Sequence, residues 1–246
     1  MLWSTVKRTI YSTFSNSALV DGEEEPKKLE LTEERVIVVG HKPFKHLVSG
    51  DLNTFITLNF LSDLKNVEFD PDGVPTMTNE GGMLPFLITT ESHTYFATAL
   101  EYLDKIGLLK TPSAEELAWQ LIIEEKLILP FYRWLWNDQK MFNEFTQSFY
   151  GGYLHPLIRR YHMRRIYGQF YGYTPNIQVL FRIDLQICEE VLDDASRVLE
   201  QNKYLSGKHQ KPADVMLASF IVFAQTFGFL EVGTSLKEYA MKVLQL

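Results

Sequence analysis

The feature that most constrains the fold is a change of hydrophobic pattern near residue 110. Before it, short runs of β-branched and aromatic residues alternate with stretches whose apolar residues recur at helical spacing. The strand-like runs are 34–41 (ERVIVVGH), 66–70 (NVEFD), 83–88 (MLPFLI) and 93–96 (HTYF), and the helix-like stretches are 49–64 and 97–109. This pattern predicts the order strand, helix, strand, loop, strand, strand, helix, in which the last two strands form a hairpin.

From residue 111 onward the pattern is helical throughout. Ser113 and Glu116 have the spacing of a capping box, and Pro130 is expected to kink or end the helix that they begin. We therefore predict an α+β protein of two domains. A thioredoxin-like α/β domain covers 34–110, and an all-α domain covers 111–246.

A long apolar run lies between Asp214 and Glu231, at residues 215–230. It is shorter than the roughly 20 apolar residues of a transmembrane helix, and Ser219, Gln225 and Thr226 interrupt it. The run therefore predicts a buried core helix.

Residues 1–33 differ from both predicted domains. The first 19 residues are rich in serine and threonine, carry Lys7 and Arg8 without an acidic residue, and space their apolar residues as in a helix. This pattern is typical of a mitochondrial targeting segment, and it also fits a short amphipathic helix that packs on the body or on a partner. As an interfacial helix, the same segment could anchor the chain to a membrane. The acidic stretch 21–30, which Pro26 interrupts, is then expected to be a linker.

Composition narrows the function classes. The formal net charge is −7, so attraction of the whole molecule to nucleic acid is not expected. Cys188 is the only cysteine, which excludes an intrachain disulfide, and its apolar surroundings predict a buried, unreactive thiol. The histidines lack the spacing of a metal site, and the paired glycines do not form phosphate-binding loops. Neither a metal nor a cofactor is expected.

Several stretches resemble the glutathione transferase superfamily. "MLPFLI" is similar to its strand with a cis-proline, here Pro85, and "YLSGKHQKPADVMLASFI" resembles the loop that leads into its central helix, which Asp214 would cap. Lys211 stands where the family usually has Ser or Thr. The stretches 84–107 and 164–192, the second with Asp184-Leu185 in a long helix, look most like the metaxin and failed-axon-connections branch.

The resemblance also indicates where an active site would lie. Glutathione transferases carry a Tyr, Ser or Cys after the first strand and an acid–Ser pair before the last helix of the first domain. Ser49 is the only hydroxyl between the first strand and its helix, and we expect it to be the N-cap. Glu91-Ser92 has the composition of the acid–Ser pair, but it falls in the predicted hairpin turn. We therefore predict no catalytic and no cofactor-binding residues. The absence of a recognisable catalytic Tyr, Ser or Cys favours a protein that is not an enzyme.

The metaxin-like resemblance implies an accessory or assembly subunit of a mitochondrial membrane complex. Such a protein would be peripheral to the membrane, and its partners would be protein subunits, with an anionic membrane surface as a further contact. The alternative is a glutathione-dependent transferase or reductase of the cytosol or mitochondrion that uses Ser49, Glu91 and Ser92.

One segment, 150–173, is rich in arginine and tyrosine. Its arginines could form a partner surface, pair with acidic residues of the following helix, or contact RNA or anionic lipid. The arginines are Arg159, Arg160, Arg164 and Arg165; the tyrosines are Tyr150, Tyr153, Tyr161, Tyr167, Tyr171 and Tyr173; the acids are Glu189, Glu190, Asp193 and Asp194.

Overall fold

The computed structural model describes residues 35–71, 84–90, 94–109, 111–152 and 177–246, together with 155, 157, 159, 161 and 163. Several residues named in the sequence analysis lie outside the described residues. They are the segment 1–33, Glu91, Ser92, Arg160, Arg164, Arg165, Tyr153, Tyr167, Tyr171 and Tyr173.

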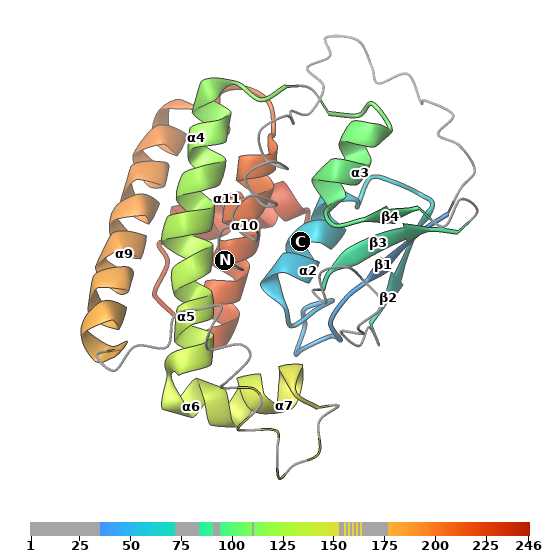
Figure 1. Ribbon diagram of the computed structural model, residues 1–246. Coiled ribbons are helices and arrows are strands. Elements are labelled where there is room, and N and C mark those ends of the chain that lie inside the picture. Colours follow the sequence, from blue (N-terminus) through green and yellow to red (C-terminus); the bar gives the residue numbers. More distant parts are fainter. Residues whose placement is uncertain are drawn as a thin grey trace.

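The N-terminal part is a four-stranded mixed sheet with strand order β2-β1-β3-β4 (Figure 1). Strand β1 is parallel to β2 and antiparallel to β3, and β4 is antiparallel to β3. The peptide bond before Pro85 is cis, as the resemblance implied. The elements are β1 (Val36–Val39), α2 (Leu52–Phe60), β2 (Val67–Asp70), β3 (Phe86–Thr89), β4 (Tyr95–Phe96) and α3 (Ala99–Lys105). This is the predicted thioredoxin-like layout.

The C-terminal part is helical. Its elements are α4 (Ala114–Ile123), the π-helix η1 (Glu124–Ile128), α5 (Leu129–Asn137), α6 (Gln139–Met141), the π-helix η2 (Phe142–Thr146), α7 (Gln147–Tyr150), α9 (Ile177–Gln201), α10 (Pro212–Phe227) and α11 (Thr234–Leu244). The predicted N-cap Ser113 begins α4, and its side chain accepts a hydrogen bond from the Glu116 amide.

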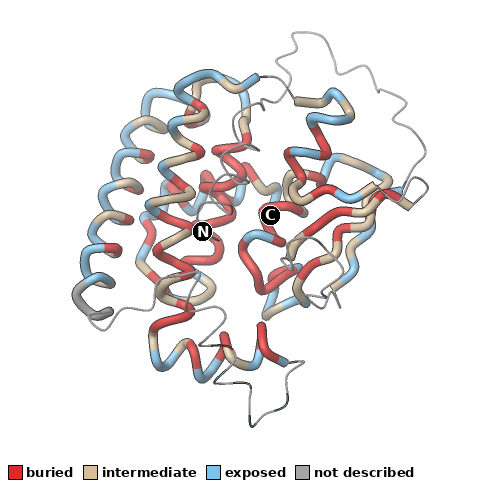
Figure 2. Tube along the Cα trace, in the orientation of Figure 1, coloured by how far each residue is buried: buried red, intermediate tan, exposed pale blue. Residues whose placement is uncertain are grey.

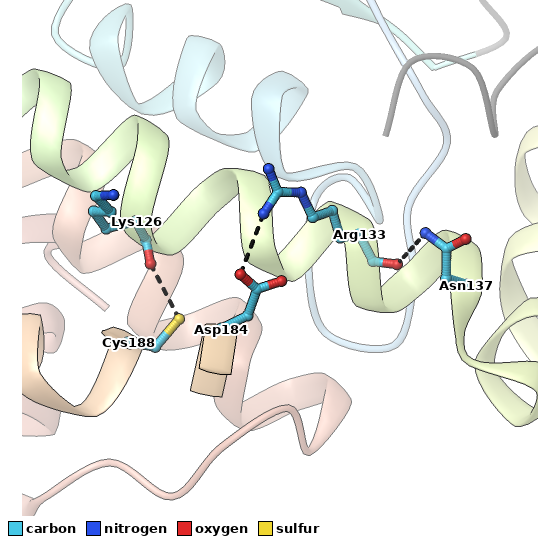
Figure 3. A network of polar contacts seen from close by, with 5 residues as sticks. All are labelled: Lys126, Arg133, Asn137, Asp184 and Cys188. Atoms are coloured by element: carbon cyan, nitrogen blue, oxygen red, sulfur yellow. Dashed lines mark hydrogen bonds and ion pairs between the residues drawn. The ribbon is translucent and has the colours of Figure 1, made fainter. Parts of the chain in front are cut away.

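Pro130 does not end its helix, because α4, η1 and α5 follow one another without a break. A proline cannot donate to the carbonyl four residues earlier, here that of Lys126. The wider π turn at 124–128 lies where this backbone hydrogen bond is missing. The Cys188 thiol on α9 donates to the Lys126 carbonyl oxygen at 3.1 Å (Figure 3). The helix therefore continues past Pro130 rather than ending there, and a distant side chain supplies a donor to the carbonyl that proline cannot serve.

Helix α10 is the axis of the helical part and packs against α2, α4 and α11. It is buried along nearly its whole length, whereas α9 has an exposed face (Figure 2). The apolar run is thus a core helix, as predicted. Among the described helices, none has both the length and the apolar character that a membrane crossing requires.

The start of α10 depends on Asp214, which is fully buried. Its carboxylate accepts hydrogen bonds from the amides of Lys211 and Leu205, at 2.7 and 2.8 Å, and from the Tyr239 hydroxyl. Burial raises the pKa of Asp214, and these donors oppose that effect. An ammonium group cannot accept a hydrogen bond, so the Lys211 side chain cannot accept from the Asp214 amide. This helix therefore has half of a capping box.

Candidate functional site

The loop between β1 and α2 places the candidate site at the junction of the two parts of the chain. Asp51, not Ser49, is the N-cap of α2: its carboxylate accepts from the Thr54 amide at 2.8 Å and from the Thr54 hydroxyl at 2.9 Å. Ser49 is fully buried, donates to the His41 carbonyl at 2.8 Å and accepts from the Asp51 amide at 3.2 Å. The prediction of Ser49 as the N-cap was wrong. Its hydroxyl bonds to His41 and Asp51 within the loop, and the N-cap of the helix lies two residues later.

Two tyrosines of the helical part complete the surroundings of Asp51. Tyr132 on α5 and Tyr150 on α7 each donate to the same carboxylate oxygen at 2.9 Å. The Tyr132 oxygen also accepts from the Asn53 amide at 3.1 Å. Asp51 is only 4% exposed, and hydrogen bonds to a charged acceptor offset the cost of burying it. We call Asp51, Thr54, Tyr132 and Tyr150 the Asp51 cluster.

His41 lies beside this cluster. Its ring is 4.9 Å from that of Tyr150 and 5.6 Å from that of Phe149, between centroids. Burial, with a smaller contribution from Lys42, lowers the pKa of His41, while the charge of Asp51 opposes the shift. The neutral imidazole is therefore the form that fits between these rings.

The remainder of the loop is held by aromatic packing. Phe44 lies 4.6 Å from Phe145 and 5.1 Å from Phe227, between ring centroids. A Cβ atom at Gly50 would come within 2.6 Å of both Phe44 and Phe149, so only glycine fits there. The loop conformation is consequently fixed by contacts to helices that are distant in sequence.

This arrangement leaves little capacity for thiol chemistry. The hydroxyls of Ser49 and Thr54 are buried and hydrogen-bonded. The N-terminus of α2, which would favour an anion, already holds the carboxylate of Asp51. A thiolate brought to this helix end would meet a second negative charge. Among the described residues, no group of three His, Cys, Asp or Glu side chains could hold a metal ion.

The second place of interest is the start of α3, where the resemblance puts the acid–Ser pair. Thr98 is the N-cap and accepts from the Glu101 amide at 3.1 Å, while Glu101 accepts from the Ala97 amide at 3.0 Å. This N-cap was missed in the sequence, although Thr98 and Glu101 have the spacing of a capping box. Ala97 has no carboxylate with which to anchor an amine.

The arginine- and tyrosine-rich segment is described only in part. Tyr150 is buried in the Asp51 cluster, so it is not available to a partner surface. Tyr161 is 63% exposed, and the Arg159 guanidinium donates to the Gly152 carbonyl at 3.3 Å. On α9, Asp194 pairs with Arg197 at 2.9 Å.

On α9, Asp184 is a buried acidic residue. Its carboxylate accepts from Arg133 on α5 at 3.2 Å (Figure 3). Within α5, the Asn137 side-chain amide donates to the Arg133 carbonyl at 2.9 Å. Burial raises the pKa of the nearby Cys188 thiol to about 12, as expected for an unreactive cysteine.

Comparisons with known proteins give structural similarity alone. No protein family model matches the chain, and no curated protein matches it. A glutathione S-transferase domain-containing protein of Marinobacter aquaeolei VT8 superposes with a TM-score of 0.56 at 14% identity, over 85% of this chain and 95% of that one. Gtt2 of Saccharomyces cerevisiae gives 0.55 at 14% identity, over 85% and 94%. The β-etherase LigF of Sphingobium sp. strain SYK-6 gives 0.53 at 17% identity, over 85% and 93%. The chain therefore has the glutathione transferase fold, in which a thioredoxin-like domain precedes a helical domain.

Proposed function

We propose that this chain is a non-catalytic protein of the glutathione transferase fold and acts, like a metaxin, as an accessory or assembly subunit of a mitochondrial membrane complex. The observation that carries the proposal is the Asp51 cluster. A buried carboxylate, held by two tyrosines of the other domain, occupies the helix end at which a transferase would stabilise a thiolate.

The electrostatics of this place support a structural role. The hydroxyls of Tyr132 and Tyr150 point their protons at Asp51, so they are not donors to a ligand. The nearest serine, Ser49, has no exposed surface. Stabilising a thiolate here would require donors aimed at the sulfur, and these donors are already used within the chain.

Support for a partner-binding role at mitochondria comes from the sequence. Residues 1–19 are basic and amphipathic, as in mitochondrial targeting segments. The segment 150–173 is rich in arginine and tyrosine, residue types enriched at protein interfaces. Within that segment the described side chain of Leu157 is 87% exposed. These features favour protein subunits as partners.

Cell fractionation combined with cross-linking tests this proposal. We expect the protein in the membrane-associated mitochondrial fraction, released by high salt or alkaline extraction, and cross-linked to other subunits. Replacing Arg160 and Arg164 together by Glu should remove the cross-links while the melting temperature stays within a few degrees. A purely cytosolic monomer without cross-linked partners would contradict the proposal.

The second candidate is a glutathione-dependent transferase or reductase of the cytosol or mitochondrion. The solved structures that share the fold include proteins named as glutathione transferases, which is an argument from the fold alone. It would use Ser49 with Glu91 and Ser92. Binding of glutathione separates the two candidates.

A further inference from the structure

One turn of the β1–α2 loop presents basic side chains to solvent. The basic residues Lys42, Lys45 and His46 are exposed. The apolar residues Pro43 and Val48 of the same turn are exposed as well. Val48 is 52% exposed, which is high for an aliphatic side chain. The turn thus places positive charge and apolar surface side by side, and we call residues 42–48 the basic turn.

The backbone holds the basic turn in a fixed shape. Phe44 and Leu47 exchange two backbone hydrogen bonds of 3.2 and 2.9 Å, and the Gly50 amide donates to the Lys42 carbonyl at 2.9 Å. Lys45 at the tip has a positive φ of 51°. Because Phe44 and Leu47 pack inward, the residues around them point outward.

The basic side chains of this turn contact a backbone carbonyl, a hydroxyl and an aromatic ring. The Lys45 ammonium donates to the Thr226 carbonyl at 2.8 Å, the His46 ring contacts the Thr226 hydroxyl at 3.3 Å, and the Lys42 ammonium lies 5.7 Å from the centre of the Phe149 ring. In the described part of the chain, none of the three basic residues has an ion pair. The nearby carboxylate of Asp51 is buried and held by its own donors. In a chain of net charge −7, the basic turn is a local positive surface.

We propose that the basic turn is a contact surface for an anionic phospholipid membrane. Its cations would meet lipid head groups, while Pro43 and Val48 would enter the interfacial layer. A lipid surface fits better than an acidic peptide, because it accepts aliphatic and cationic groups together from one continuous turn. The inference rests on the proposed role at a membrane and names the surface that would face it.

The attraction is modest and sensitive to salt. One lysine close to an anionic membrane strengthens binding about fivefold, and salt at physiological concentration screens this within about 8 Å. We therefore expect reversible binding to vesicles that contain an anionic lipid, weakening as salt is added.

Vesicle flotation of the full chain tests the proposal. The probes are vesicles of phosphatidylcholine with cardiolipin and vesicles of phosphatidylcholine alone. Replacing Lys42 and Lys45 together by Glu should lower partition into the cardiolipin vesicles about tenfold or more. The matched control replaces Lys208 and Lys237 by Glu, an equal change of charge on exposed residues elsewhere, and should change partition less than about twofold. If the double variant melts earlier than wild type, Lys42→Glu alone, which breaks no hydrogen bond of the side chain, should still lower partition several-fold.

The outcomes separate this inference from the proposed function. Equal flotation of wild type and the Lys42/Lys45 variant would overturn the basic turn as a membrane surface and would leave the subunit role untouched. The same holds if the variant loses a protein partner but floats normally. Recovery of the protein from cells as a cytosolic monomer would instead remove the proposed function.

Discussion

At the scale of the residue, Asp51 has an unusual environment for the N-cap of a helix. An exposed N-cap would need only its amide donors, but Asp51 is buried and holds the hydroxyls of Tyr132 and Tyr150 as well. Those two residues are 81 and 99 positions away, so the carboxylate joins the domains. Its charge should therefore matter more than that of an ordinary cap.

Asp51→Asn tests this charge. Asparagine is as good an N-cap as aspartate, but it presents a neutral oxygen to the two tyrosines. We expect a loss of about 1–3 kcal/mol in the free energy of unfolding, measured in denaturant. The matched control is Asp138→Asn at the N-cap of α6, which should cost only a few tenths of a kcal/mol. Equal effects of the two variants would mean that the tyrosine bonds contribute nothing.

Glu124 in η1 is an acidic residue with a raised pKa. Burial, with repulsion from Glu125, raises its pKa from 4.5 to about 7. Because the pKa is higher in the folded state, the stability that the protonated form provides is present below pH 4.5 and is lost as the pH rises through 7.

Glu124→Gln imitates the protonated form, so it should stabilise the protein by about 2–3 kcal/mol at pH 8 and change little near pH 4.5. Denaturant unfolding at both pH values measures this, with the exposed Glu115→Gln as the control. A gain that is the same at both pH values would show that the charge of Glu124 is not the cause.

At the scale of the element, the π turn of the α4–η1–α5 helix depends on a bond from another helix. Pro130 removes the donor for the Lys126 carbonyl, and the thiol of Cys188 on α9 supplies one. Cys188 thus has a structural reason for its position in α9, next to the Asp184–Arg133 pair.

A double-mutant cycle measures this relation. Cys188→Val removes the thiol donor from the Lys126 carbonyl and should cost about 1 kcal/mol. In a Pro130→Ala background the backbone amide at 130 can donate instead, so the cost should fall by about 1 kcal/mol. Strict additivity of the two changes would contradict the account of the π turn.

At the scale of the whole molecule, much of the fold could be predicted from local pattern. The β-branched run in 34–41 and the helical stripe in 49–64 predicted β1 and α2, and the apolar run after Asp214 predicted α10. The site could not be predicted in this way, because the partners of Asp51 come from α5 and α7. Ser49 and Asp51 are equally good N-caps in sequence, and only packing of the loop decides between them.

The central claim, that this fold no longer binds glutathione for catalysis, is tested most directly by thermal unfolding with millimolar glutathione. A ligand at about 100 times its dissociation constant would add about 2.7 kcal/mol of stability, which is roughly 5–10 °C in a chain of this size. The account predicts no shift. A clear shift that disappears when Glu91 and Ser92 are replaced by Gln and Ala would contradict it and would favour the glutathione-dependent enzyme.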